Sequence, residues 1–203
     1  TIVFTIIFNR VAGITTDGIQ PYLFYMSGII AWNYFANCLT TTSNTFITNA
    51  GVFGKVYFPR IIVPLSTVVS SLYRLGVQLI MFFVFYFYYH YVGNPNIQPS
   101  FQTLLLIPLM IIQMAMLGQG IGMIISSLTT KYRDLSYLIS FGTQLLMYAS
   151  PIVYPLSVVP DSYKPYIIAN PMTPIIEGFR QAFIGKGLFD LNMFLYSLLL
   201  TLF

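Results

Sequence analysis

The sequence predicts an all-α membrane protein, which we expect to cross the bilayer six times as a single domain over residues 1–203. Of its residues 57% are hydrophobic and only 7% are charged, against about 25% in soluble domains. Asp, Glu, Lys and Arg are missing from three long stretches: Gly18 to Gly54, Leu75 to Thr130 and Leu135 to Pro160. Such stretches can form the helices of roughly 20 residues that span hydrocarbon.

Six apolar segments follow one another, separated by polar, Gly-rich or Pro-rich connections. The four inner segments cover residues 22–46, 61–89, 101–128 and 136–154. The first segment ends near Phe8 and the last starts near Leu191. Thr1 to Phe8 is already apolar and lacks the basic region and cleavage site of a signal peptide. We therefore expect both end segments to be truncated parts of spans in a longer protein.

The cations in the connections indicate the orientation. The connections at 49–60 and 129–134 lie on one side of a six-pass topology, and each carries two cations. The three connections on the other side carry one cation, none and three cations. The three cations lie in the longest connection, and long loops influence the orientation least. We therefore expect 49–60 to be cytoplasmic. The cations form no cluster of the kind that binds nucleic acid.

The connection between the last two spans, residues 155–190, is too long for a tight turn and too apolar for a solvated loop. Thr173 can cap a helix that begins with Pro174 and stops near Gly185 or Gly187. Two short apolar helices can form a re-entrant hairpin when protein or water satisfies their backbone groups. The alternative is an amphipathic cap on the outer surface.

Three charged residues of the apolar regions are candidates for function. Glu177 and Arg180 lie three apart on the outer helix, where they can pair at the gate. An exposed pair would contribute only about 0.2 to 1 kcal/mol. Arg74 falls on the order of 20 Å into the third segment, where an arginine costs roughly 2.5 to 3.5 kcal/mol on insertion scales.

Burial in the bundle or in a wet cavity is therefore expected for Arg74, where a guanidinium is suited to bind phosphate groups. In the alternative, the third helix starts later and Arg74 lies near the cytoplasmic surface. The nearby motif "GQGIG", Gly118 to Gly122, lies inside an apolar segment and predicts close packing against another helix rather than phosphate binding.

The polar break "NAGVFGKVYFPR" holds two cations, Lys55 and Arg60, and an aromatic pair. It can form a short interfacial helix that fits the groove of another protein. The residues alone favour the alternative, a solvated turn whose cations only fix the orientation.

Three blocks, in this order, resemble the membrane subunit of type-2 ABC exporters, in the branch that exports O-antigen, capsule and teichoic-acid polymers. They are "NAGVFGKVYFPRIIVPLSTVVSSL", "YRDLSYLISFGTQLLMYASPIVYPLSVVP" and "NPMTPIIEGFRQAFIGKG". The resemblance implies a homodimer with two copies of an ATPase subunit, which hold the ATP and Mg. It also implies gate helices between the last two spans, and an amphipathic helix before the first span that these residues do not include.

The resemblance also implies functional residues. The coupling helix that docks on the ATPase corresponds to Gly54, Lys55, Val56, Tyr57, Phe58, Pro59 and Arg60. The second cytoplasmic loop, which contacts the ATPase or only anchors the orientation, is Lys131, Tyr132, Arg133 and Asp134. Sugar polymers slide over aromatic faces, so our candidates for the conduit are Phe35, Tyr148 and Tyr154, together with Arg74.

The sequence offers no set of nucleophile, base and orienting group, no metal cluster and no nucleotide-binding loop. We expect no catalytic site, cofactor or metal in this chain. The expected function is export of polyprenyl-linked polysaccharide across the bacterial cytoplasmic (inner) membrane. The alternatives are an ABC exporter of a lipid or drug, an ATP-independent channel or secondary transporter, and a membrane scaffold.

Overall fold

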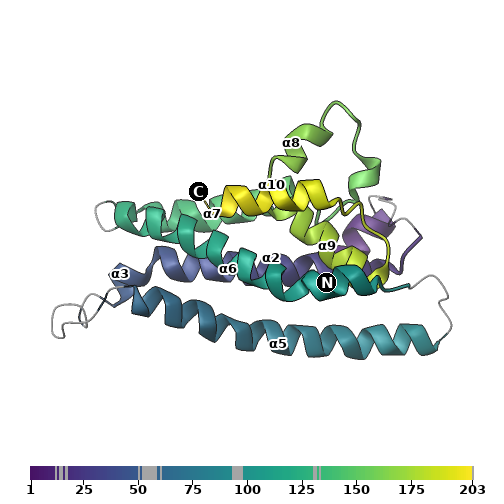
Figure 1. Ribbon diagram of the computed structural model, residues 1–203, viewed down its shortest axis with the longest axis horizontal. Coiled ribbons are helices and arrows are strands. Elements are labelled where there is room, and N and C mark those ends of the chain that lie inside the picture. Colours follow the sequence, from purple (N-terminus) through teal and green to yellow (C-terminus); the bar gives the residue numbers. More distant parts are fainter. Residues whose placement is uncertain are drawn as a thin grey trace.

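A bundle of long helices forms the protein, as Figure 1 shows for the computed structural model. The structure describes residues 1–11, 13, 16, 18–49, 51, 59, 61–92, 98–129, 132 and 134–202, and within these ranges every regular element is a helix. Helices α2 (Pro21–Ser43), α5 (Ile62–Tyr91) and α6 (Phe101–Thr129) follow the long axis. The expected all-α fold class is confirmed for the described residues.

Two of these helices, α5 and α6, are long and apolar enough to cross a membrane by length and composition. Helix α2 lies inside the bundle, where it packs against α5, α6 and α9 (Met172–Ile184). Fifteen of its 23 residues are buried, so α2 is the central helix of the fold. The count of six spans stays a prediction.

The ends of the helices gather at two opposite ends of the bundle. The Thr129 hydroxyl donates to the Ser43 carbonyl at 3.0 Å, so α2 and α6 end together, at what we call the Thr129 end. At the opposite end, the Gln98 N–H donates to the Ile184 carbonyl at 3.2 Å. We call it the Gln98 end. There the Tyr22 ring lies 4.8 Å from that of Phe85, so α2 begins beside the last turns of α5.

A close backbone contact joins α2 and α6 at the predicted glycine motif. A Cβ atom on Gly118 would lie 2.8 Å from Cys38 Cβ and 3.1 Å from the Phe35 carbonyl oxygen. A Cβ atom on Gly122 would lie 2.7 Å from Thr42 Cβ. These two glycines let the backbones approach, which is how small residues stabilise helix pairs in membranes. The packing interpretation of this motif is confirmed.

The second predicted span is interrupted near its end. Helix α2 stops at Ser43, and a separate turn, α3, covers Thr45–Thr48. Side chains in this stretch bond back to carbonyls of the preceding turn: Thr41 to Asn37 at 2.6 Å, and Asn44 to Thr40 at 3.1 Å. Such bonds compete with the helix ladder and favour a break.

The fifth predicted span is shorter than expected, because α7 covers only Leu135–Ala149. Ser150 is extended, with φ −99° and ψ 150°, and Pro151 follows it. A proline disfavours helical geometry in the residue before it, so Pro151 explains why the helix does not continue to Tyr154. The first segment, in contrast, extends past Phe8: α1 (Ile2–Phe4) continues as a π-helix, η1 (Thr5–Val11).

The connection after α7 contains a 3-10 turn, η2 (Leu156–Val158), and two helices, α8 (Lys164–Ile168) and α9. It leads into α10 (Leu191–Leu202), which starts where predicted. Helix α9 begins at Met172, two residues before the predicted start, and Thr173 does not cap it. The Thr173 hydroxyl instead donates to the Ile167 carbonyl at 2.6 Å. The predicted stop is confirmed, because Gly185 takes the left-handed φ of +78°.

The glycine contact predicts different effects for two neighbouring substitutions. In the full-length protein, Gly118→Ala places a methyl group against backbone and Cβ atoms of α2, and we expect a loss of about 1–3 kcal/mol from overpacking. Gly120→Ala is the control, because its Cβ meets nothing within 4 Å. Thermal unfolding in detergent measures both. Equal midpoints for Gly118→Ala and wild type would contradict the described contact.

Candidate functional site

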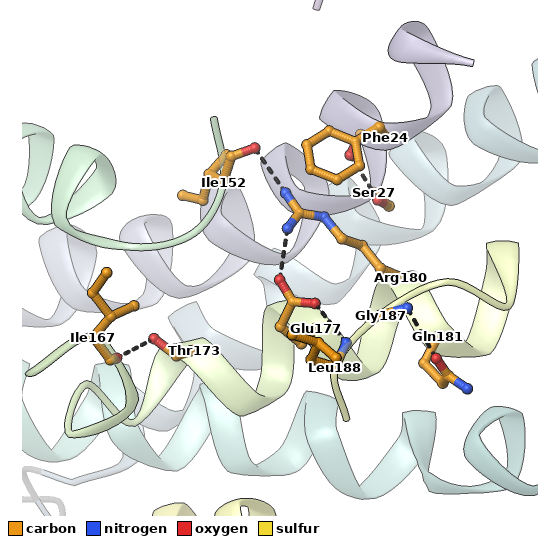
Figure 2. A network of polar contacts seen from close by, with 10 residues as sticks. All are labelled: Phe24, Ser27, Ile152, Ile167, Thr173, Glu177, Arg180, Gln181, Gly187 and Leu188. Atoms are coloured by element: carbon orange, nitrogen blue, oxygen red, sulfur yellow. Dashed lines mark hydrogen bonds and ion pairs between the residues drawn. The ribbon is translucent and has the colours of Figure 1, made fainter. Parts of the chain in front are cut away.

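A buried ion pair on α9 holds three separate segments of the chain together (Figure 2). Arg180 Nη1 donates to Glu177 Oε1 at 2.8 Å, and Nη2 donates to the Ile152 carbonyl at 2.8 Å. The guanidinium also lies 3.7 Å from the centre of the Phe24 ring on α2. Glu177 Oε2 accepts the Leu188 N–H at 3.0 Å. We call these five residues the α9 clasp.

The expectation of an exposed pair was wrong. The side chains of Arg180 and Glu177 are 1% and 4% exposed. The spacing of three residues predicted the pair, but it carries no information on what surrounds the helix. The surroundings include Gly28 of α2, where a Cβ atom would lie 3.2 Å from Arg180 Nη2, so this glycine leaves room for the guanidinium.

The paired charges of the clasp hold α9 in its position. A buried charge is stable only when it is paired and its remaining donors are bonded, and the loss of one partner leaves the other uncompensated. Here the partners of Arg180 come from α2, from the segment after α7 and from α9 itself. The clasp therefore fixes α9 against the two segments that come before it in the chain. A role in gating stays a prediction.

Arg74 lies on the outside of the described bundle rather than inside it. Its Nη1 donates to Asn37 Oδ1 of α2 at 2.9 Å, and Asn37 Nδ2 donates to the Ser71 hydroxyl at 2.6 Å. Helix α5 begins at Ile62, so the later helix start is wrong, while the depth of Arg74 in the membrane stays a prediction. Arg74 lines a pocket of about 200 Å³ between α2 and α5. The other residues of its lining are Asn33, Tyr34, Asn37, Ser71, Leu75 and Gln78.

The polar neighbours of Arg74 were not predicted from the sequence. A signal was present, because Asn33 and Asn37 are four apart on α2, while Ser71, Arg74 and Gln78 are three and four apart on α5. Such spacings put side chains on one helix face. Each polar residue alone is weak evidence, and only the pairing of the two helices brings the two rows together.

The three aromatic candidates for the conduit lie in different surroundings. Phe35 is 3% exposed and packs against Trp32, with ring centres 5.3 Å apart. Tyr148 on α7 is 48% exposed, and Tyr154 is partly buried against the core. The described chain therefore does not bring Phe35 and Tyr148 onto one surface. Their assignment to a conduit stays a prediction.

The two predicted cytoplasmic loops fall largely outside the described residues. Those outside are Gly54, Lys55, Val56, Tyr57, Phe58, Arg60, Lys131 and Arg133. The described members are Pro59, whose carbonyl accepts the Ile62 N–H, and Tyr132 and Asp134, which are exposed. The helices that flank both loops end or begin at the Thr129 end (Figure 1). Both loops therefore connect helices at the same end of the bundle, as the orientation argument expected.

A family model described as "ABC-2 type transporter" matches residues 1–184. The chain belongs to the ABC-2 type transporter family. This assignment confirms the resemblance carried by the three sequence blocks, and it covers the clasp residues Arg180 and Glu177 as well as Arg74.

Several relatives of this ABC-2 chain are named as export or transport proteins. It is 31% identical to the O-antigen export system permease protein RfbA of Klebsiella pneumoniae, over 80% of this chain and 61% of the relative. An RfbA of Myxococcus xanthus is 24% identical, over 84% of this chain and 63% of the relative. The polysialic acid transport protein KpsM of Escherichia coli is 24% identical, over 97% and 75%. The chain thus spans about three fifths of the length of the RfbA relatives.

The clasp predicts an asymmetry between single and double substitutions. In the full-length ABC-2 protein, Arg180→Met leaves Glu177 buried without its partner, and we expect a loss of about 3–5 kcal/mol. The double variant Glu177→Leu/Arg180→Met removes both charges, so we expect it to unfold later than Arg180→Met. Chemical or thermal unfolding in detergent measures this order.

Lys164→Met is the matched control for the clasp. Lys164 and Asp161 have the same spacing of three residues and a distance of 2.7 Å, but Asp161 is 94% exposed. The hydrogen bond from Lys164 holds the pKa of Asp161 below its ordinary value, yet water screens such a surface pair. We expect little change in stability. A loss as large as that of Arg180→Met would show that burial is not what makes the clasp important.

Proposed function

We propose that this chain is the membrane subunit of an ATP-driven exporter that moves a lipid-linked polysaccharide across the bacterial cytoplasmic membrane. The observation that carries the proposal is the ABC-2 family match over residues 1–184. The names of the relatives, O-antigen export permease and polysialic acid transport protein, support the class of substrate. In this proposal the chain has no catalytic site, and a partner subunit binds ATP and Mg and hydrolyses the ATP.

The proposed assembly contains two copies of this chain and two copies of the ATPase. The coupling segment Gly54 to Arg60 receives the ATP-driven movement, and the loop 131–134 lies beside it on the cytoplasmic side. Two observations support this placement: both loops connect helices at the Thr129 end, and each of them carries two cations.

We propose six spans and a re-entrant segment that contains α9. The Pro171 carbonyl, just before α9, accepts a bond from Ser197 at 2.7 Å, and Ser197 accepts one from Gln113 of α6 at 2.7 Å. Gln113 lies twelve residues into α6, or about 18 Å along it. The other end of α9, at Ile184, bonds to Gln98. These contacts support a position of α9 from about mid-membrane depth to the outer end, with protein around its backbone, as hydrocarbon requires.

ATP binding is proposed to bring the two coupling segments together and to rearrange the spans at the dimer axis. The polysaccharide then passes outward beside α9. Because the α9 clasp ties this helix to α2 and to Ile152, a movement of α2 would be transmitted to the outer gate.

Deletion of the complete gene in its source organism tests the substrate. We expect lipid-linked polysaccharide to accumulate in cell extracts while the cell surface lacks it, because synthesis continues without export. Gel analysis of extracts and of surface material measures both pools, and the intact gene supplied in trans is the control. An unchanged surface polysaccharide would contradict the substrate assignment and favour export of another lipid or a drug.

A further inference from the structure

The positive charge of Arg74 has no acidic partner in this part of the molecule. The sequence contains no Asp or Glu between Asp17 and Asp134, so α2, α5 and α6 supply no carboxylate. Lys164 pairs with Asp161 and Arg180 pairs with Glu177, so neither of these pairs involves Arg74. Arginine stays charged in proteins, and a charge among apolar helices is costly without a counter-charge. The missing anion must come from outside these three helices.

Arg74 lies at the depth of one leaflet. Helix α5 has 30 residues and is about 45 Å long, which exceeds the roughly 30 Å of hydrocarbon. Its aromatic last turns, Tyr86 to Tyr91, are typical of one membrane interface. About 30 Å back from there, the helix reaches the region of Val68, six residues before Arg74. Helical side chains point toward the N-terminus, so the guanidinium reaches toward the interface at the Thr129 end.

The pocket around Arg74 suits an anion with several acceptor oxygens. A guanidinium has five N–H donors, and its bond to Asn37 uses one of them. The amides of Asn33 and Gln78 line the same pocket and add further donors. Its volume of about 200 Å³ corresponds to several water molecules at about 30 Å³ each, enough for a phosphate group. Arginine matches phosphate by paired hydrogen bonds.

A polar track leads from this pocket to the Thr129 end. A second pocket of about 410 Å³ lies further along the same pair of helices. Its lining is Thr and Asn throughout: Thr40, Thr41, Asn44, Thr45, Thr48, Asn49 and Thr67. On α2 and α3 the residues 33, 37, 41, 44 and 48 recur every three or four positions, which places them on one helical face. Hydroxyl and amide groups therefore lie on this face between the Thr129 end and Arg74.

The surface beside the pocket suits a lipid tail. On α5, four large apolar residues within five positions of Arg74 are 42–79% exposed: Val69, Leu72, Tyr73 and Val77. A free anion would gain nothing from this surface. An anion attached to a hydrocarbon chain could place its charge in the pocket and leave its tail in the bilayer.

We propose that the pocket of Arg74, Asn37, Asn33 and Gln78 binds the phosphate or pyrophosphate headgroup of a membrane lipid from the leaflet at the Thr129 end. Arg74 supplies the counter-charge, and Asn37 positions it through the bond to Oδ1. The site itself follows from charge and geometry. Its assignment to the polyprenyl carrier of a polysaccharide rests on the proposed function.

Native mass spectrometry of the full-length permease with its ATPase partner tests the site. The probes are polyprenyl pyrophosphate, the same polyprenol without phosphate, an anionic phospholipid and inorganic pyrophosphate. We expect polyprenyl pyrophosphate to bind, Arg74→Gln to weaken this binding at least tenfold, and Arg74→Lys to weaken it less. Lys164→Gln removes a cation elsewhere and should bind as wild type does. Unchanged unfolding midpoints would show that Arg74→Gln folds normally.

Four results would overturn the inference. Equal binding by Arg74→Gln and wild type would show that Arg74 is not the ligand. Equal binding of the polyprenol would show that the phosphate is not recognised. Tighter binding of free pyrophosphate than of either lipid would indicate a soluble anion. A disulfide between Gln78→Cys residues of two copies would show that a second copy covers the pocket.

The inference and the proposed function can fail separately. If Arg74-dependent binding is found while the deletion strain still displays its polysaccharide, the lipid site stands and the polysaccharide assignment is wrong. The anionic phospholipid probe would then be expected to bind as well as the polyprenyl lipid. If the deletion strain loses surface polysaccharide while Arg74→Gln binds normally, export stands and the lipid site is wrong.

Discussion

The pairing of Arg180 with Glu177 is the interaction on which the arrangement of the last third of the chain depends. Burial of Ile175, Ile176 and Phe179 draws α9 into the bundle, but apolar burial is non-directional and does not by itself fix which segments the helix contacts. The guanidinium supplies the explanation by bonding Ile152, Glu177 and the face of Phe24 at once. Gly28 leaves room for the guanidinium, because a Cβ atom there would meet Arg180. Gly178 leaves room for α6, because a Cβ atom there would meet Met110.

The two arginines of the apolar region illustrate two solutions to one problem. Charge is expensive where water is scarce, so each guanidinium requires an anion. Arg180 obtains it from its own helix and is buried, which is typical of a structural residue. Arg74 has only the neutral Asn37 beside it and is exposed, which is typical of a residue that receives its counter-charge from a ligand. Only the arrangement of Arg74 leaves guanidinium N–H donors available to bind a ligand.

The sequence predicted the features that depend on local chemistry. The small residues Gly118 and Gly122 predicted the close α2–α6 contact, and Gly185 predicted the end of α9. Pro151 indicates that α7 ends early, but the apolar pattern continues to Tyr154 and led to a longer predicted helix. The burial of Glu177 and Arg180 could not be predicted, because it depends on segments that are distant in sequence. The polar row around Arg74 was missed for the same reason, and the coupling segment 54–60 lies outside the described residues except for Pro59.

ATP-driven movement of a lipid-linked polysaccharide by the reconstituted exporter tests this account most directly. The full-length permease and its ATPase partner would be placed in vesicles that carry the polyprenyl-linked polymer. The polymer that becomes accessible to a polysaccharide-cleaving enzyme on the far side would be measured over time. We predict that accessibility rises only with hydrolysable ATP, and that Lys55→Ala/Arg60→Ala abolishes the rise while Lys164→Ala does not. Equal accessibility with and without ATP would contradict the account.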